Sequence, residues 1–233
     1  MLSFKSFITE GVHDPAKLKA IFLAGGPGSG KSHVVKKVRG DLGFKMVNSD
    51  DLLELGMKKH GLDPKMPEHE TERRDMVRRR AKELTGKKAD LYQQGRLGMI
   101  IDGTGKDFAE IHRKSEHLKT LGYDTHMLFV NTSLDVAHAR NLKRARSVPA
   151  NIVDQAWRAV QENMGKFQDY FGRDNFTVID NSNDGDESGA LDKLHKHIRA
   201  IATMNVKNPV GRDWIRREEK NIKRGKNIPT SMS

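Results

Sequence analysis

Cysteine is absent from this sequence of 233 residues. Disulfide bonds, thiolate nucleophiles and cysteine-ligated zinc are therefore excluded, and no disulfide-linked partner is expected. Long hydrophobic runs are also missing, because no apolar stretch approaches the ~18 residues that span a bilayer. Residues 1–10 place their apolar side chains at helical spacing and lack the small-residue cleavage site of a signal peptide. These absences predict a cytoplasmic protein that does not associate with membranes.

Acidic residues are outnumbered by basic ones, and the excess positive charge is uneven. The chain has 42 Lys and Arg against 31 Asp and Glu, a net charge of +11. Residues 205–233 alone hold eight basic and three acidic residues. A field of this sign suits polyanionic partners such as nucleic acid, although the same residues could simply form a solubilising surface.

Apolar runs and helical patterns alternate along the chain in the order of a doubly wound α/β domain. Short apolar runs predict five buried strands, at residues 19–24, 45–48, 99–102, 124–130 and 176–180. Helical patterns occupy residues 31–39, 51–60, 68–94, 108–121, 133–144, 149–168 and 191–204. The sequence therefore predicts an α/β fold with a parallel five-stranded sheet flanked by helices. A basic C-terminal extension follows it, with a helix near residues 210–224.

The segment GGPGSGKS, residues 25–32, lies between the first predicted strand and the first predicted helix and satisfies G-x-x-x-x-G-K-[ST]. Its glycines let backbone N–H groups wrap around phosphate oxygens, and the helix that follows adds its positive end. Lys31 would reach the β- and γ-phosphates of ATP, and the Ser32 hydroxyl would ligate Mg²⁺. A chance glycine-rich turn is the weaker alternative. The other predicted nucleotide-binding residues of this P-loop are Gly26, Gly28, Ser29 and Gly30.

Carboxylates stand at the ends of the second and third predicted strands. In open parallel sheets, ligands bind at this carboxyl edge of the sheet. Asp50 is the candidate general base that takes the proton from an attacking hydroxyl. The alternative is that Asp50 only caps the next helix, a role that Ser49 or Asp51 could fill instead. Asp102 is the candidate carboxylate for Mg²⁺, directly or through water, although an Asp before a Gly is also common in turns.

An arginine-rich segment, residues 138–149, separates two predicted helices. Charge spreads over the phosphoryl oxygens during phosphoryl transfer, so a cation that closes over the γ-phosphate accelerates the reaction. Arg140 and Arg144 are four residues apart and share a helix face, and Arg146 lies beyond the turn. At least one of them is expected to contact phosphate. The alternative is an exposed basic helix end.

Four motifs together resemble P-loop kinases related to the bacteriophage polynucleotide 5′-hydroxyl kinase and to the zeta toxins. They are GPGSGKS, the Asn-x-Asp-Asp of residues 48–51, the Asp-x-Thr of residues 102–104 and R-N-x-K-R…V-P of residues 140–149. The resemblance covers roughly residues 20–183. It implies that Asp50 is the general base, that Arg144 contacts the transferred phosphate and that Asn181 belongs to an adenine-side loop. The first ten residues are similar to the starts of many tailed-phage proteins, which would place the protein in a bacterial host cytoplasm.

The sequence departs from these relatives shortly after the candidate base. Both relatives carry an arginine there that helps to hold the acceptor, whereas this chain has Leu52-Leu53-Glu54-Leu55. The acceptor site is therefore expected to be altered. The arginines of the following helix that could substitute are Arg73, Arg74 and Arg78.

These patterns predict an ATP-dependent phosphotransferase that acts on an alcohol acceptor. A polynucleotide or nucleoside-type 5′-hydroxyl ranks first because of the positive charge, a nucleotide sugar second and another small metabolite third. A prediction of another class is a nucleic-acid-binding protein in which ATP switches the C-terminal arm. The chain is expected to divide into a docking segment (1–18), a P-loop kinase domain (19–204) and a basic arm or tail (205–233).

Overall fold

The computed structural model describes residues 12–31, 42–63, 67–143, 149–182 and 187–224. Its strands are β1 (Lys19–Ala24), β2 (Lys45–Val47), β3 (Met99–Asp102), β4 (Asp124–Asn131) and β5 (Phe176–Asp180). Each predicted strand is confirmed to within one residue at either end. This agreement follows from the short apolar runs, which only a buried strand accommodates between glycine-rich or polar loops.

The helices also lie where the sequence places them. They are α3 (Asp50–Lys59), η1 (Glu68–Glu70), α4 (Thr71–Gln94), α5 (Phe108–Thr120), α6 (Leu134–Leu142), α7 (Ala150–Phe171), α8 (Glu187–Thr203) and α9 (Pro209–Lys223). The helix predicted for residues 31–39 lies outside the described residues. α8 begins four residues earlier than predicted, and Pro149 is the N-cap of α7.

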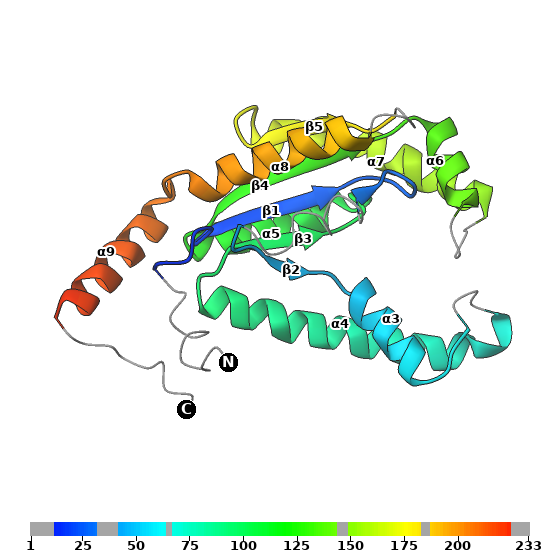
Figure 1. Ribbon diagram of the computed structural model, residues 1–233, viewed down its shortest axis with the longest axis horizontal. Helices are drawn as coiled ribbons and strands as arrows, with labels where there is room; N and C mark the ends of the chain where they lie inside the picture. Colours follow the sequence, from blue (N-terminus) through cyan, green and yellow to red (C-terminus); the bar gives the residue numbers. More distant parts are fainter. Residues whose placement is uncertain (1–11, 32–41, 64–66, 144–148, 183–186, 225–233) are drawn as a thin grey trace.

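The five strands form one parallel sheet in the order β2-β3-β1-β4-β5 (Figure 1). β1 is therefore the central strand, paired with β3 on one side and β4 on the other. In this register Leu23 lies beside Asp102, and Ala24 lies beside Phe129. The carboxyl ends of the strands consequently share one edge, and the loops that follow β1, β2 and β3 meet there.

Each face of the sheet is buried beneath helices, so the central strands are apolar on both sides. One core joins alternate residues of β1 and β4 to α8; its members include Ile21, Leu23, Leu128, Val130, Leu194 and Ile198. The other core joins the intervening residues to α5 and α7; its members include Phe22, Met127, Phe129, Leu118, Val160 and Phe167. These two cores hold the strand ends, and thus the site, in fixed positions.

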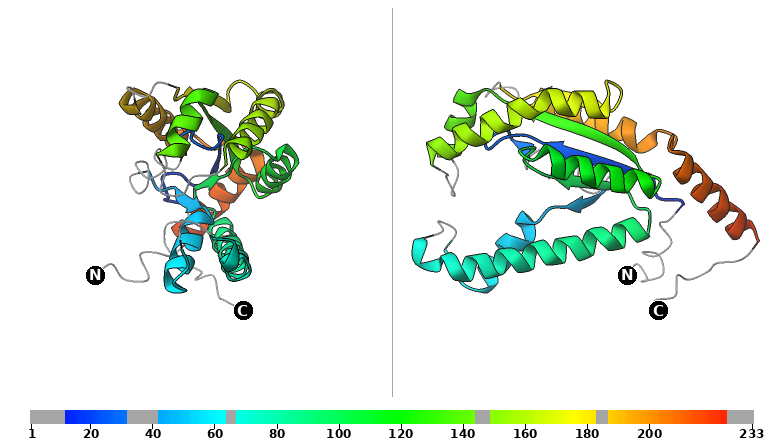
Figure 2. Two further views of the ribbon diagram at one scale, coloured as in Figure 1. Left: turned by 90° about the vertical axis from the view of Figure 1, so that its right-hand side faces the viewer. Right: turned by 180° about the vertical axis from the view of Figure 1, so that it is seen from behind.

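Helices α3 and α4 form a lobe of their own, made of residues 50–63 and 67–94 in the described part of the chain, which projects from the sheet (Figures 1 and 2). The lobe has a separate apolar cluster of Leu53, Met57, Leu62 and Ala81. Gly56 permits the two helices to approach closely, because a Cβ there would lie 2.5 Å from a side-chain carbon of Val77. Most of α4 is exposed, and Ala81 is its one buried residue among those described.

None of the helices in the described part of the chain is both long enough and apolar enough to cross a bilayer.

Candidate active site

The P-loop leaves β1 and adopts a conformation that only glycine tolerates at two positions. Gly28 and Gly30 have φ angles of 76° and 85°, which is the left-handed region. A Cβ on Gly28 would also lie 2.6 Å from the carbonyl oxygen of Ala137 in α6. Within the described residues, the backbone N–H groups of Gly26, Gly28 and Gly30 donate to no other group. They are therefore available as an anion nest.

Three side chains hold this loop from neighbouring elements. Asn181, just after β5, donates its Nδ2 to the carbonyl oxygen of Ser29 at 2.8 Å and is buried. Arg140 of α6 donates its Nη1 to the carbonyl oxygens of Asn181 at 2.9 Å and Gly28 at 3.4 Å. Trp157 of α7 lies against Gly26 and donates its indole N–H to Thr132. The loop is consequently shaped by β5, α6 and α7 before any phosphate binds.

The carboxylates predicted at the strand ends are linked by Asn48. Its Nδ2 donates to Oδ2 of Asp102 at 3.0 Å, and its Oδ1 accepts the backbone N–H of Asp50 at 2.7 Å. The side chain of Asn48 thus joins the end of β2 to the end of β3 and to the first turn of α3. Sequence reasoning treated Asn48 only as part of a motif; a polar residue closing a predicted strand was the available signal.

Burial of the Asp102 carboxyl raises its pKa above the ordinary value. The positive charge of Lys31 lowers the pKa, whereas the negative charges of Asp50 and Asp51 raise it further. Three carboxylates therefore share the electrostatic neighbourhood of one described lysine. Such a concentration of negative charge favours a bound cation.

The donor set fits Mg²⁺ bound together with nucleotide phosphates. Oδ1 of Asp102 is buried and has no hydrogen-bond partner within the described residues, so it is available to a metal or to a metal-bound water. No group of three His, Cys, Asp or Glu that could hold a metal occurs in the same part of the chain. Mg²⁺ in phosphoryl-transfer sites is typically held by one or two carboxylates plus phosphate and water oxygens. Asp102 is therefore the residue that would hold it.

The loop after β3 is braced by a residue that sequence reasoning missed. Asn163 of α7 donates its Nδ2 to the carbonyl oxygens of Gly105 at 3.1 Å and Lys106 at 2.7 Å. In the same loop, Thr104 accepts the N–H of Gly25 at 3.2 Å. The position of Asp102 relative to the P-loop is thus fixed at its backbone. The available signal was a polar residue on the apolar face of a predicted helix.

Several predicted residues have a different setting or lie outside the described part. Ser49 is at the N-cap position of α3, but its side chain makes no capping hydrogen bond, and Asp51 lies within the first turn. Ser29 keeps its hydroxyl buried and without a partner in the described residues. The predicted residues that lie outside the described part are Ser32, Arg144 and Arg146.

The arginines considered as acceptor ligands contact the lobe itself. Arg73 donates to the carbonyl oxygen of His60 at 2.9 Å. Arg74 donates to the carbonyl oxygen of Pro67 and to the hydroxyl of Thr71. Both side chains therefore tie the start of α4 to the segment that follows α3. In contrast, Arg79 and Lys82 are exposed; neither has an ion pair among the residues described.

The sequence pattern of this site matches a known family. A family model described as an AAA domain matches residues 21–167, which is more than half of the chain. The chain belongs to this AAA-domain family. The matched residues include the P-loop, both strand-end carboxylates, the whole arginine-rich segment and most of α7. No curated protein sequence matches the chain.

Solved structures show the same kinase-like P-loop fold at low sequence identity. A proposed kinase from Chloroflexus aurantiacus J-10-fl has a TM-score of 0.56 and 14% identity, covering 79% of this chain and 98% of that one. A chain of the Pnkp1/Rnl/Hen1 RNA repair complex has a TM-score of 0.51 and 18% sequence identity, and the match covers 65% of this chain and 46% of that one. A chain of the PezAT toxin–antitoxin system of Streptococcus pneumoniae has a TM-score of 0.49 and 16% sequence identity, and the match covers 95% of both chains. The two likenesses with TM-scores above 0.5 show the fold.

Proposed function

We propose that this protein is an ATP-dependent kinase that transfers the γ-phosphoryl group to a hydroxyl. The observation that carries the proposal is the meeting of Asn48, Asp50 and Asp102 beside Lys31, at the edge of the sheet where the P-loop leaves β1. A phosphate-binding loop alone would fit any nucleotide-binding protein. A carboxylate base next to it is what transfer to an alcohol requires.

The roles of the chain's own groups follow from this arrangement. The N–H groups of the P-loop and Lys31 would bind the phosphates, and Asp50 would take the proton of the acceptor hydroxyl. Mg²⁺ held by Asp102 would neutralise charge on the phosphate oxygens. Arg144 would supply a further cation at the γ-phosphate. Arg140 and Asn181 act on the carbonyl oxygens of the loop, so we assign them the role of positioning it.

We propose a polynucleotide or nucleoside-type 5′-hydroxyl as the acceptor. The supporting observation is a local concentration of basic residues on α4, where residues 73–82 hold six Lys or Arg and one acid, in the same lobe as the candidate base. Arg79 and Lys82 are exposed and free of ion pairs within the described residues, so both can meet phosphate groups of an acceptor. The absence of an arginine at Leu52–Leu55 means that the acceptor would be held differently from that of the related kinases.

The test is incubation with γ-labelled ATP and Mg²⁺ in the presence of a panel of 5′-hydroxyl oligonucleotides, nucleosides and nucleotide sugars. We expect label in the oligonucleotides or nucleosides, and none with the Lys31→Ala variant. Label only in a nucleotide sugar would refute the acceptor while keeping the kinase. Tight ATP binding with no labelled product from any class would refute the kinase and favour an ATP-switched binding protein.

A further inference from the structure

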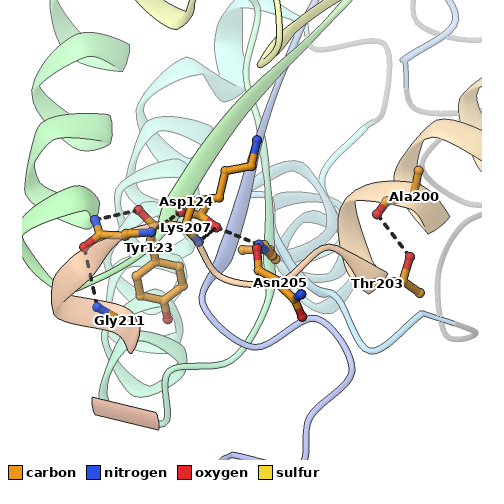
Figure 3. A network of polar contacts seen from close by, with 9 residues as sticks. Tyr123, Asp124, Ala200, Thr203, Asn205, Lys207 and Gly211 are labelled. Carbon is orange, nitrogen blue, oxygen red and sulfur yellow. Dashed lines mark hydrogen bonds and ion pairs between the residues drawn. The ribbon is translucent and has the colours of Figure 1, made fainter. Parts of the chain in front are cut away.

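The C-terminal helix α9 is anchored to the sheet by Asp124, the first residue of β4 (Figure 3). Its Oδ1 accepts the backbone N–H of Asn208 at 2.8 Å, and its Oδ2 accepts that of Lys207 at 2.8 Å. Oδ2 also pairs with the ammonium of Lys19 at 2.6 Å. The Lys19 side chain is 2% exposed and donates as well to the carbonyl oxygen of Asn205. The chain between α8 and α9 is therefore held at three points, Asn205, Lys207 and Asn208.

Further contacts hold the first turns of α9 against the domain. Asn208 caps the helix through its Oδ1, while its Nδ2 donates to the carbonyl oxygens of Lys119 and Tyr123. Gly211 lies directly against the backbone of Gly122, where any Cβ would overlap. Side chains of α9 that pack on the sheet core are Trp214 and Ile215. The first half of α9 is thus part of the domain, although it covers little of the sheet.

The exposed surface of α9 is strongly basic. Its exposed cations are Arg212, Arg216, Arg217, Lys220, Lys223 and Arg224, and its exposed acids are Asp213 and Glu219. Only Arg216 has an ion pair, with Asp213, among the described residues. Arg212, Arg216 and Lys220 are spaced four residues apart and so share one face. A rise of ~1.5 Å per residue puts about 6 Å between neighbouring charges of this stripe.

The base of α9 adds a further cation. A hollow of about 280 Å³ beside it is lined by Lys119, Lys207 and Asn208, among others. The Lys119 ammonium is engaged by Glu116 and Tyr170, whereas Lys207 is exposed and has no ion pair within the described residues. Lys207 therefore adds an exposed cation beside the hollow at the base of α9.

The basic surface of α9 lies far from the P-loop. α9 is anchored at the amino ends of β1 and β4, whereas the P-loop follows the carboxyl end of β1. Figure 1 shows α9 projecting beyond the sheet at the end opposite α3 and α6. The six residues of β1 alone span about 20 Å at ~3.3 Å per residue. A ligand that touches both regions must be a long polymer.

We infer that the outward face of α9 is a second binding surface for a nucleic-acid strand, which holds a long polymer while its end occupies the active site. Closely spaced Arg and Lys on a rigid helix match the regular negative charge of a phosphate backbone. An anionic membrane fits less well, because Trp214 and Ile215 pack on the protein core. The exposed apolar residues of α9, Val210 and Ile222, are each two residues from the ends of the stripe and so lie on other faces of the helix. The polymer's role in catalysis rests on the proposed function, but its binding does not.

The binding test compares two matched triple variants. Arg212→Gln/Arg216→Gln/Lys220→Gln neutralises the stripe on α9, and Lys193→Gln/Lys196→Gln/Arg199→Gln removes the same charge from the exposed face of α8. Fluorescence anisotropy with a labelled single strand of about 30 nucleotides is followed against salt concentration, without ATP. For the α9 variant we expect the slope of log affinity against log salt to fall by about 2, since each lost phosphate contact contributes about 0.7. The α8 variant should retain the wild-type slope.

The catalytic test uses polymer length. The α9 variant should lose about tenfold or more in kcat/KM for a 5′-hydroxyl strand of about 30 nucleotides, and retain wild-type kcat/KM for one of about four. The short strand cannot span both regions, since each nucleotide advances a strand by ~3.4 Å in a duplex. Equal losses for both lengths would overturn the tethering role.

The outcomes separate this inference from the proposed function. If no oligonucleotide is phosphorylated but the α9 variant alone loses binding, the 5′-hydroxyl acceptor is wrong and the surface stands. If both triple variants weaken binding equally, or if binding to phosphatidylserine vesicles but not to nucleic acid depends on the stripe, the surface proposal is wrong. Circular dichroism and thermal unfolding of both variants establish that they are folded.

Discussion

Asn48 directly follows β2, Asp102 ends the neighbouring parallel strand β3, and the amide of Asn48 donates to Oδ2 of Asp102 at 3.0 Å. The oxygen of the same amide group accepts the backbone N–H of Asp50, so one side chain holds both the carboxylate of Asp102 and the backbone of Asp50. Only the other oxygen of Asp102 remains without a partner in the described residues. We propose that the two carboxylates have separate roles, with Asp50 on α3 as the base and Asp102 on β3 as the cation ligand.

Substitution of the candidate base should affect turnover far more than nucleotide binding. For Asp50→Asn we expect turnover to fall by ~10²–10⁴ with ATP affinity within a few-fold of wild type, because general-base catalysis contributes about this much. Asp51→Asn is the matched control, since it removes the neighbouring carboxylate from the same exposed helical turn. Steady-state kinetics and ATP titration measure both. Equal losses in the two variants would remove Asp50 from its assigned role.

Removal of the buried charge at Asp102 should stabilise the fold while abolishing activity. An aspartate pKa that is raised by folding contributes stability below the ordinary value of about 3.9, and this is lost as pH rises through the raised pKa. At neutral pH the ionised carboxyl therefore destabilises the folded protein, and Asp102→Asn removes this effect. We expect a thermal midpoint at or above that of wild type at pH 7, and a smaller stabilisation by ATP with Mg²⁺. A variant that is less stable than wild type at pH 7, or that responds equally to ATP with Mg²⁺, would contradict the assignment.

Loss of the α9 anchor should be strongly destabilising. Asp124→Asn leaves Lys19 as a buried charge without its partner and weakens the acceptor of two backbone N–H groups. Breaking such a buried pair typically costs about 3–5 kcal/mol. The control Asp213→Asn breaks the exposed pair with Arg216, which should cost less than about 1 kcal/mol. Urea unfolding measures both free energies. Similar values would show that the anchor contributes little.

The buried His126 should make the protein sensitive to moderate acid. Burial, assisted by the charge of Lys19, lowers its pKa to about 4, and the partly opposing effect of Asp124 does not restore it. Between about 6.5 and 4 the unfolded chain binds a proton that the folded chain does not, so stability is present above this window and falls with pH through it. A shift of this size corresponds to about 3 kcal/mol.

We therefore expect His126→Gln to flatten the dependence of unfolding free energy on pH between 6.5 and 4, whatever its effect on stability at pH 7. Part of the slope should remain, because burial also lowers the pKa of His197. The exposed His69→Gln should leave the slope unchanged. If His126→Gln retains the full wild-type slope, the acid sensitivity arises elsewhere.

The sequence by itself determined the sheet, the phosphate-binding loop and the strand-end carboxylates. Each of these depends on local information: an apolar run that must be buried, glycines required by left-handed φ angles, and polar residues that end a parallel strand. The five predicted strands are confirmed for this reason, and the P-loop lies within the matched AAA domain. The closer relationship to polynucleotide kinases and zeta toxins remains a prediction. The general-base and phosphate-contacting roles remain predictions, and Ser32 and Arg144 lie outside the described residues.

Only the tertiary structure decided which side chains act on one another across the fold. Asn48 reaches Asp102 over 54 residues, Asn181 reaches Ser29 over 152, and Lys19 reaches Asn205 over 186. No periodicity or spacing encodes such contacts, because they depend on strand order and on the packing of helices from distant parts of the chain. For α9, the sequence shows the basic composition. The contacts with Asp124 that hold the helix in place depend on the tertiary structure, because they join residues far apart in the chain.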